Sequence, residues 1–330
     1  MPELRRDPIN GRWVIIATER AKRPAGISLL PDPPQDELDP FAPGNEHLTP
    51  PAILTYYDES ASPRRWTLRV IPNKFPALRV EGELRREGVG LYDKMTGIGA
   101  HEVIIETPDR AKRFAQFNEN EMHLVFLALR ERVRDLRRDI RLKHILIFKN
   151  DGRLAGATQQ HSHSQLVALP MVPKNAQEEL DGAKEYYEFK DRNVYLDVID
   201  QELRYGERLV TENPDFVAIA PFASRFPFEI WVIPRAPLAS FQNCRDDQLT
   251  FLAKILVRTL RLLSRALGNF AYNLVVHSAP LQEENLASYQ WHIEITPRLT
   301  RIGGFEAGSG FYINPTPPET AADYLRKIKL

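Results

Sequence analysis

Two histidines and a glutamine alternate in the stretch HSHSQLVALP, residues 161–170. Alternate residues of a β-strand point to the same face of the sheet, so His161, His163 and Gln165 would share one face. A neutral imidazole is a good nucleophile toward phosphorus near pH 7, because its pKa lies close to that pH. The same pair could instead bind zinc, which needs three or four ligands, or form a structural polar cluster. The spacing alone leaves these three kinds of site open.

A glycine-containing loop, NDGRLAGAT at residues 150–158, leads into this stretch. Its two glycines, Asn150 and Thr158 can offer backbone N–H groups and a hydroxyl to a phosphate. His163 would face this cradle, and a nearby backbone carbonyl could hold its far ring nitrogen and fix the tautomer. Charge on the oxygens of a phosphoryl group is stabilised mainly by donors already in place. The loop therefore favours attack on a bound phosphorus atom.

The elements that must hold these residues are short strands and one long helix. We expect a strand at 101–106, a helix that begins after the N-cap Asn118, and a strand at 144–148 before the histidine strand. Apolar residues of the helix recur at spacings of three and four, which gives it one buried face. Further strands are expected near the N-terminus, at 13–16 and 66–71.

This order of elements recurs in the second part of the chain. The matching segments lie at 227–235, 246–267, 271–280 and 289–297. Glu102 and Glu229 are 127 residues apart, and His163 and His292 are 129 apart. We therefore predict an α+β protein of two tandem halves, each an antiparallel sheet with a packed helix. The expected boundaries are 1–173 for the N-terminal half with its HSHSQ motif, 174–204 for a helical connector, and 205–330 for the C-terminal half.

Composition excludes several classes of protein. The 330 residues contain 44 basic and 44 acidic side chains, so no net charge favours nucleic acid or an anionic membrane. Cys244 is the only cysteine, which excludes an intrachain disulfide and a site built from several thiolates. We find neither the apolar core of a signal peptide nor a run of about 18 apolar residues. The expectation is a cytoplasmic protein without membrane or nucleic-acid partners.

Several blocks of the sequence, in this order, resemble the galactose-1-phosphate uridylyltransferase branch of the histidine triad superfamily. They cover nearly the whole chain: RRDPINGRWVIIATERAKRP, DPFAPGNE, IPNKFPAL, HEVIIETP, FKNDGRLAGATQQHSHSQ and YQWHIEITPRLTRIGGFEAGSGFYINPTPPE. The resemblance implies two histidine-triad-like halves. It also implies a transferase of carbohydrate metabolism, in galactose metabolism for the best-known members.

The resemblance implies a ping-pong nucleotidyl transfer. His163 would attack the α-phosphorus of a nucleotide sugar such as UDP-glucose and expel sugar 1-phosphate. A sugar phosphate or phosphate would then accept the nucleotidyl group, with Gln165 hydrogen-bonded to the phosphoryl oxygens. The leading prediction is a hexose-1-phosphate uridylyltransferase. The alternatives are an adenylyltransferase or ADP-glucose phosphorylase on the same scaffold and, in another class, a nucleotide-binding protein without catalysis.

Other positions match substrate contacts of the family. Asn150 and Thr158 match contacts to nucleotide phosphates, and Asn73 matches a nucleotide contact. Arg20 and Arg23 match arginines that reach substrate phosphate across a dimer interface, so a homodimer is implied. Guanidinium groups suit such phosphate recognition.

The chain departs from the family at its zinc sites, and no cofactor is expected. The C-x-x-C positions read Asp39-Pro40-Phe41-Ala42, and Arg110 stands where a later histidine is expected. Only His161 remains, and we place it at the substrate site. We predict that this zinc site is lost and that Arg110 pairs with Asp39, with His161 hydrogen-bonded nearby.

A second metal site of some members also reads as incomplete. His277, His292 and Glu178 or Glu179 fit it, whereas the fourth position reads as Gln290. We expect His292 to be a core or substrate-side residue.

The acceptor loop at 305–315 does not carry the Glu and Gln pair that holds hexose hydroxyls in the best-known uridylyltransferases. Its small residues Gly308, Ser309 and Gly310 could instead hold a phosphate through backbone N–H groups. This loop and the HSHSQ spelling resemble the plant-type branch, whose members are ADP-glucose phosphorylases.

Overall fold

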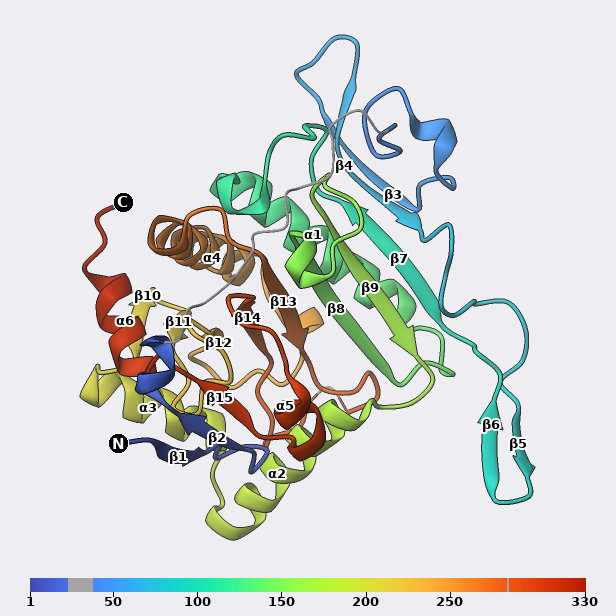
Figure 1. Ribbon diagram of the computed structural model, residues 1–330. Helices are drawn as coiled ribbons and strands as arrows, with labels where there is room; N and C mark the ends of the chain where they lie inside the picture. Colours follow the sequence, from blue (N-terminus) through green and yellow to red (C-terminus); the bar gives the residue numbers. More distant parts are fainter. Residues whose placement is uncertain (23–37, 284) are drawn as a thin grey trace.

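One antiparallel sheet of ten strands forms the centre of the protein in a computed structural model that describes residues 1–22, 38–283 and 285–330 (Figure 1). The strand order is β10-β11-β12-β14-β13-β8-β9-β7-β4-β3. The strands of the N-terminal half are β3 (Leu54–Asp58), β4 (Arg65–Pro72), β7 (Ala100–Ile105), β8 (His144–Asp151) and β9 (His163–Leu169). Those of the C-terminal half are β10 (Leu209–Glu212), β11 (Phe216–Ile219), β12 (Ile230–Pro234), β13 (Tyr272–His277) and β14 (His292–Pro297).

The strand order confirms the internal duplication. Read outward from the centre, one half runs β8-β9-β7-β4-β3 and the other β13-β14-β12-β11-β10. Each half therefore builds the same sheet from strands in the same sequence order. The halves join where β13 pairs with β8, so their two sheets are continuous. At this junction, β8 and β13 each have a hydrogen-bonded strand on both sides.

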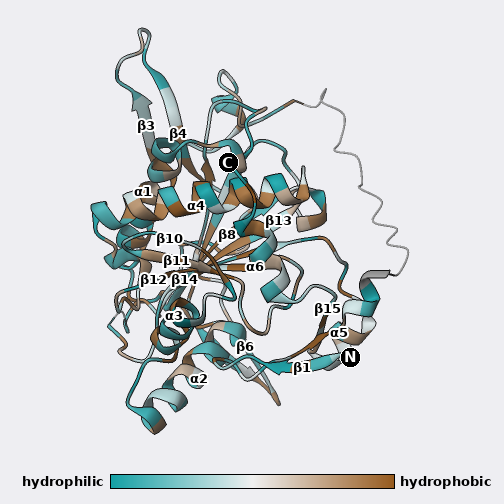
Figure 2. Ribbon diagram, turned by 90° about the vertical axis from the view of Figure 1, so that its left-hand side faces the viewer, coloured by the Kyte–Doolittle hydropathy of each residue, from teal (hydrophilic) through white to brown (hydrophobic). Residues whose placement is uncertain are grey.

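Two long helices cover one face of the sheet. They are α1 (Glu119–Leu136) and α4 (Asp246–Leu267), and they pack against each other. Asn118 caps α1 as predicted, because its side chain accepts a hydrogen bond from the backbone N–H of Glu121. Figure 2 shows hydrophilic and hydrophobic residues interleaved along both helices, as expected for helices with one buried face. Their apolar residues join those of the strands in the largest core cluster.

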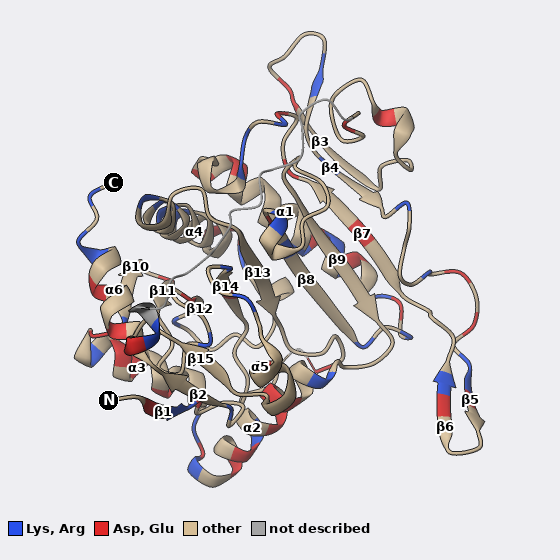
Figure 3. Cartoon of the chain, in the orientation of Figure 1, with Lys and Arg blue, Asp and Glu red and all other residues tan. Residues whose placement is uncertain are grey.

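On the opposite face, the connector covers the C-terminal half, and Phe41 packs on Ile71, Val103 and Ile105 of the N-terminal half. The connector forms two helices, α2 (Lys174–Lys190) and α3 (Val194–Tyr205), which carry charged residues of both signs (Figure 3). Tyr195 and Ala183 of these helices are buried in a second core cluster against Trp231 and Ile233 of β12. The connector is therefore a packed layer rather than the surface helix that its charge suggested.

Smaller elements complete the chain. A three-stranded sheet contains β1 (Glu3–Arg6), β2 (Trp13–Ile16) and β15 (Tyr312–Asn314), with α5 (Gly304–Ser309) and α6 (Pro318–Arg326) nearby in sequence. A hairpin of β5 (Arg86–Val89) and β6 (Tyr92–Met95) projects from the body (Figure 1). The short 3-10 helices are η1 (Thr18–Lys22), η2 (Glu46–Leu48), η3 (Phe114–Gln116), η4 (Arg153–Ala155) and η5 (Phe241–Asn243). Among the helices of the described ranges, none combines the length and apolar character of a membrane span.

Candidate functional site

His163 is the first residue of β9, which lies between β7 and β8 on the face of the N-terminal half that the connector leaves uncovered. Leu166 and Ala168 of this strand are buried toward α1 and α4, so the alternation of the strand turns His163 and Gln165 the other way. The predicted shared face of these two residues follows from this register.

The ring of His163 is held in one tautomer. Its Nδ1–H donates to the backbone carbonyl of His161 at 2.9 Å, so Nε2 keeps its lone pair. Burial, and then the charge of Lys149, lower the pKa of this imidazole from its ordinary value of 6.5. Phe41 packs edge-on against the ring, with centroids 5.5 Å apart. The imidazole is therefore neutral and oriented at neutral pH.

His163 lines a cavity of about 740 Å³. The residue is only 6% exposed, so it is reached through this cavity rather than from open solvent. Asn150, Gly152 and Thr158 of the preceding loop line the same cavity. The structure thus brings the predicted nucleophile, the predicted amide and the predicted hydroxyl to one place.

The loop itself differs from the expected cradle of backbone N–H groups. The N–H groups of Ala155 and Ala157 donate to the carbonyl of Gly152, and that of Gly156 donates to the carbonyl of Arg153. These bonds close η4 on itself. These three N–H groups are therefore already in use, and the loop residues that line the cavity with a donor side chain are Asn150, Arg153 and Thr158.

A buried ion pair supports strand β9 next to His163. Lys149 Nζ lies 2.6 Å from Glu106 Oε2 and donates to the backbone carbonyl of His163 at 2.9 Å. Ser162 and Ser164, on either side of His163, donate their hydroxyls to the same Glu106 carboxylate. Because every member is buried and hydrogen-bonded, this network fixes the backbone on both sides of the imidazole.

Gln165 is held by a histidine that the sequence analysis missed. His101 of β7 accepts a hydrogen bond at Nδ1 from the backbone N–H of Ala77, so its Nε2 carries the proton and donates to Gln165 Oε1 at 2.8 Å. The amide nitrogen of Gln165 then remains as a donor. Asn73 Nδ2 lies 3.1 Å from the same Nε2, which places Asn73 beside this pair. A signal was present, since His101 alternates with Val103 and Ile105 in a predicted strand.

The position of the family's first zinc site holds an ion pair instead. Arg110 Nε lies 3.8 Å from Asp39 Oδ2, which confirms the predicted contact. His161 contacts the same Asp39 oxygen through Nδ1 at 2.8 Å and the carbonyl of Thr107 through Nε2 at 2.6 Å. Both ring nitrogens are thus engaged, although His161 borders the cavity. Ala42 has no donor atom and Arg110 is a cation, so these residues do not fit zinc.

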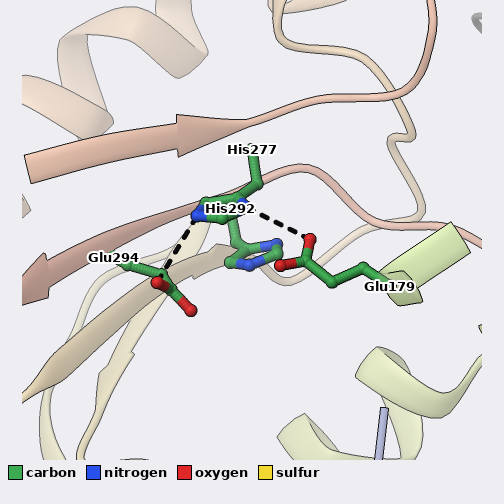
Figure 4. A group of neighbouring side chains, drawn as sticks. All are labelled: Glu179, His277, His292 and Glu294. Carbon is green, nitrogen blue, oxygen red and sulfur yellow. Dashed lines mark hydrogen bonds and ion pairs between the residues drawn. The ribbon is translucent and has the colours of Figure 1, made fainter. Parts of the chain in front are cut away.

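A second cluster, in the C-terminal half, has the composition of a metal site. One ligand atom from each of Glu179, His277, His292 and Glu294 lies within 4.8 Å of the others (Figure 4). The assignment of Gln290 to the fourth position is wrong, since its amide binds the backbone of Pro234, Ala236 and Leu238. Two imidazoles and two carboxylates suit a divalent ion.

The two carboxylates of this cluster also form ion pairs with neighbouring cationic side chains. Burial opposes charge on His277, but Glu179 and Glu294 raise its pKa to about 10. Its ring stacks on His292 at 4.6 Å, and burial together with the charge of His277 lowers the pKa of His292 to about 4. Arg225 pairs with Glu294 from the other side. A metal here would cross-link α2 to β13 and β14, and none of the four side chains borders the His163 cavity.

Among the described residues, two other predicted contact regions, Arg20 and 308–310, do not line the His163 cavity. Arg20 borders a separate pocket with Arg301 and Tyr312. Gly308 and Ser309 belong to α5, and the N–H of Gly310 donates to the carbonyl of Glu306. The expected phosphate loop is therefore a short helix with part of its N–H groups in use. Arg23 lies outside the described residues.

Comparison with known proteins gives the family. Residues 1–173 match the model of the galactose-1-phosphate uridyl transferase N-terminal domain, which covers the whole His163 site. The chain belongs to this family. Residues 96–328 also match a domain family of unknown function, DUF4921.

Members of the family with assigned activities are similar along the whole chain. ADP-glucose phosphorylase of Arabidopsis thaliana is 34% identical over 100% of this chain and 93% of its own length. Galactose-1-phosphate uridylyltransferase of Thermotoga maritima is 27% identical over 100% of this chain and 99% of its own. The crystal structure of the Arabidopsis phosphorylase with bound ADP-glucose superposes with a TM-score of 0.85, at 32% identity, over 100% of this chain and 99% of that one. The protein is thus an enzyme of the nucleotidyltransferase class.

Proposed function

We propose that the enzyme transfers the adenylyl group of ADP-glucose to inorganic phosphate through a covalent intermediate on His163. One observation carries the proposal: Nε2 of His163 is unprotonated because Nδ1–H is bound to the carbonyl of His161, at the wall of a cavity of about 740 Å³. A neutral imidazole held in this way is ready for in-line attack on phosphorus.

The reaction has two steps. Nε2 attacks the α-phosphorus, a P–N bond forms, and the bond from this phosphorus to the bridging oxygen breaks and releases glucose 1-phosphate. An oxygen of inorganic phosphate then attacks the same phosphorus, the P–N bond breaks, and ADP leaves with the imidazole restored. The chain's part is to hold the ring and to stabilise charge on the non-bridging oxygens. Asn150, Thr158 and the amide nitrogen of Gln165 would supply those donors.

The adenylyl group is favoured over the uridylyl group by the comparisons. The relative of 34% identity is an ADP-glucose phosphorylase, and the similar crystal structure holds ADP-glucose. Uridylyl transfer between UDP-glucose and a hexose 1-phosphate is the second candidate, because the matching family model and the Thermotoga relative carry that name.

The assembly belongs to the same proposal. Arg20 borders a different pocket from His163 within one chain, so its predicted phosphate contact requires a second copy. We therefore expect a homodimer in the cytoplasm, in which Arg20 and the segment 308–310 of one protomer approach the cavity of the other. We also propose that the Asp39 position holds no zinc.

Intact mass measurement tests the proposal directly. The enzyme is incubated with ADP-glucose or with UDP-glucose, without phosphate. An adenylyl increment that is absent from His163→Ala, and that disappears as ADP when phosphate is added, is the expected result. A uridylyl increment alone would favour the second candidate. Binding of either nucleotide sugar without any increment would identify a nucleotide-binding protein and overturn the proposal.

A further inference from the structure

The seam between the two halves runs directly beside the phosphate site. In the antiparallel pair of β13 and β8, Asn273 of the C-terminal half lies opposite Asn150 of the N-terminal half. The two halves approach closely here, since a Cβ on Gly152 would lie 2.8 Å from the Cβ of Ala271. Gly152 also has a φ of +83°, which favours glycine at this turn. The cavity loop is therefore built against the half that lacks the nucleophile.

Both the nitrogen and the oxygen of the Asn273 side-chain amide have hydrogen-bond partners. Its Nδ2 donates to Asn150 Oδ1 at 2.7 Å and to the carbonyl of Ala155 at 2.9 Å. Its Oδ1 accepts from Nε of Arg298, the residue that follows β14. Arg298 is itself placed by its backbone N–H, which donates to the carbonyl of Ala271 at 2.7 Å, and by the ring of Phe226 beneath its guanidinium.

The chemistry of the end groups dictates the orientation of both amides. A guanidinium only donates, so the oxygen of Asn273 must face Arg298. The carbonyl of Ala155 only accepts, so the nitrogen of Asn273 must face Ala155 and Asn150. Asn150 must then present its oxygen to Asn273, and its nitrogen is left for the cavity. This nitrogen lies 3.6 Å from the position of a Cβ on Gly156, on the loop side of the residue.

This orientation matters because a phosphate needs donors. If the amide of Asn150 turned over, its oxygen would face an anion and its NH₂ group would oppose the NH₂ group of Asn273. The backbone N–H groups of Ala155, Gly156 and Ala157 are already in use, so they cannot take the place of the Asn150 amide. The orientation of this amide therefore decides whether Asn150 adds to the donors of the cavity or opposes an anion there.

We propose that Asn273 and Arg298 are positioning residues: they form a relay from the C-terminal half that fixes the NH₂ group of Asn150 toward the nucleotide phosphates. The inference rests on the proposed function, because it assigns the ligand of Asn150 as a phosphate. Neither residue touches the reacting atoms.

A double-mutant cycle on the full-length enzyme tests the relay. Asn150→Ala, Asn273→Ala and the double variant are compared by kcat/KM for ADP-glucose in the presence of phosphate. A hydrogen bond to a charged group corresponds to about 10- to 100-fold, so each single variant is expected to lose activity in this range. The double variant is expected to match Asn150→Ala, because Asn273 acts only through Asn150.

Two further variants separate positioning from folding. Asn273→Asp cannot donate to Asn150 and would turn its amide over, so it should lose more activity than Asn273→Ala. Arg298→Met releases the far end of the relay and should have a smaller effect in the same direction. Asn269→Ala, at an exposed residue just before β13, is the matched control and should leave activity and Tm unchanged.

The outcomes are distinguishable from failure of the proposed function. The relay would be overturned if the losses of kcat/KM in the two single variants multiplied in the double variant. It would also be overturned if Asn273→Ala kept kcat/KM within twofold of the unaltered enzyme at equal Tm. If the unaltered enzyme converts neither ADP-glucose nor UDP-glucose, the proposed function fails. The same cycle is then measured as calorimetric affinity for ADP, where coupling supports the relay, and its absence or a lack of ADP binding overturns it.

Discussion

The two halves place a histidine at the same point of the same framework and surround it in different ways. His163 begins β9 and His292 begins β14, and each directs Nδ1 to the backbone carbonyl two residues earlier. His163 borders a cavity, whereas His292 is enclosed by Tyr195, Trp231 and the ring of His277. The two surroundings differ because different segments of the chain pack on the sheet beside His163 and beside His292. The connector helices cover this face in the C-terminal half, whereas in the N-terminal half Phe41 covers Ile71, Val103 and Ile105 and a cavity remains beside His163.

This contrast indicates that a tautomer alone does not make a nucleophile. The carbonyl of residue i−2 leaves Nε2 unprotonated in both rings, because the geometry at the start of the strand is repeated. Access, phosphate donors and a supporting charge network then distinguish His163. In the C-terminal half the same strand position is part of a buried cluster of ion pairs.

The largest expected effect separates the two histidines. His163→Ala removes the proposed nucleophile, and kcat for the proposed adenylyl transfer should fall by about 10⁴-fold or more. His292→Ala should keep activity of the same order and lower the free energy of unfolding by about 1–3 kcal/mol, because it empties a buried site. Glucose 1-phosphate release and urea unfolding measure the two effects. Equal losses of activity in both variants at equal stability would contradict the contrast.

The next effect concerns the buried ion pair of Lys149 and Glu106, which supports the strand of His163. Lys149→Met leaves the carboxylate of Glu106 buried without its cation and should cost about 3–5 kcal/mol of unfolding free energy. Lys149→Met combined with Glu106→Gln should recover much of this loss, because neither charge remains. Asp246→Asn is the control at an exposed partner of Arg130 and should leave the free energy of unfolding nearly unchanged, because solvent screens this pair. A small loss in Lys149→Met would show that the pair does not support the strand.

The pH profile should show that His163 remains neutral in mild acid. Its pKa is lowered by burial and by Lys149, and only the neutral ring attacks phosphorus. The acid limb of kcat/KM for ADP-glucose should therefore lie below pH 6.5, the ordinary value for histidine. An acid limb of kcat/KM above pH 6.5 that does not occur in the single-turnover rate would mean that a group other than His163 titrates there. An acid limb above pH 6.5 in the single-turnover rate itself would contradict the lowered pKa of His163.

The smallest expected effect is on metal content. Because Ala42 and Arg110 cannot ligate zinc, His161→Ala should leave the zinc content of the purified protein unchanged. Elemental analysis of this variant beside Glu179→Gln separates the two halves, since the second variant alters the cluster that could hold an ion. A content of about one zinc per chain that is lost in His161→Ala would contradict the prediction.

Local pattern predicted much of the site. Alternation assigned His163 and Gln165 to one face, and the loop residues Asn150 and Thr158 followed from sequence proximity. The repeat predicted the duplicated framework, and α4 has the predicted bounds of 246–267. These features depend on short stretches of chain, in which strand and helix periodicity decide the outcome.

Long-range pairing decided the rest. Asn273 meets Asn150 only because β13 pairs with β8, and no spacing in the sequence gives that register. His101 reaches Gln165 across the pair of β7 and β9. Glu294 rather than Gln290 joins His292, because Gln290 precedes the strand and its amide is already used by backbone groups.

The pairing of β8 with β13 has a consequence for how the gene product can be divided. A fragment that ended after β9 would contain His163 and its loop, but β8 would become an edge strand and would lose the pairing of residues 147–151 with β13. Such an edge is a template for association with other chains, so the excised half should aggregate rather than work alone.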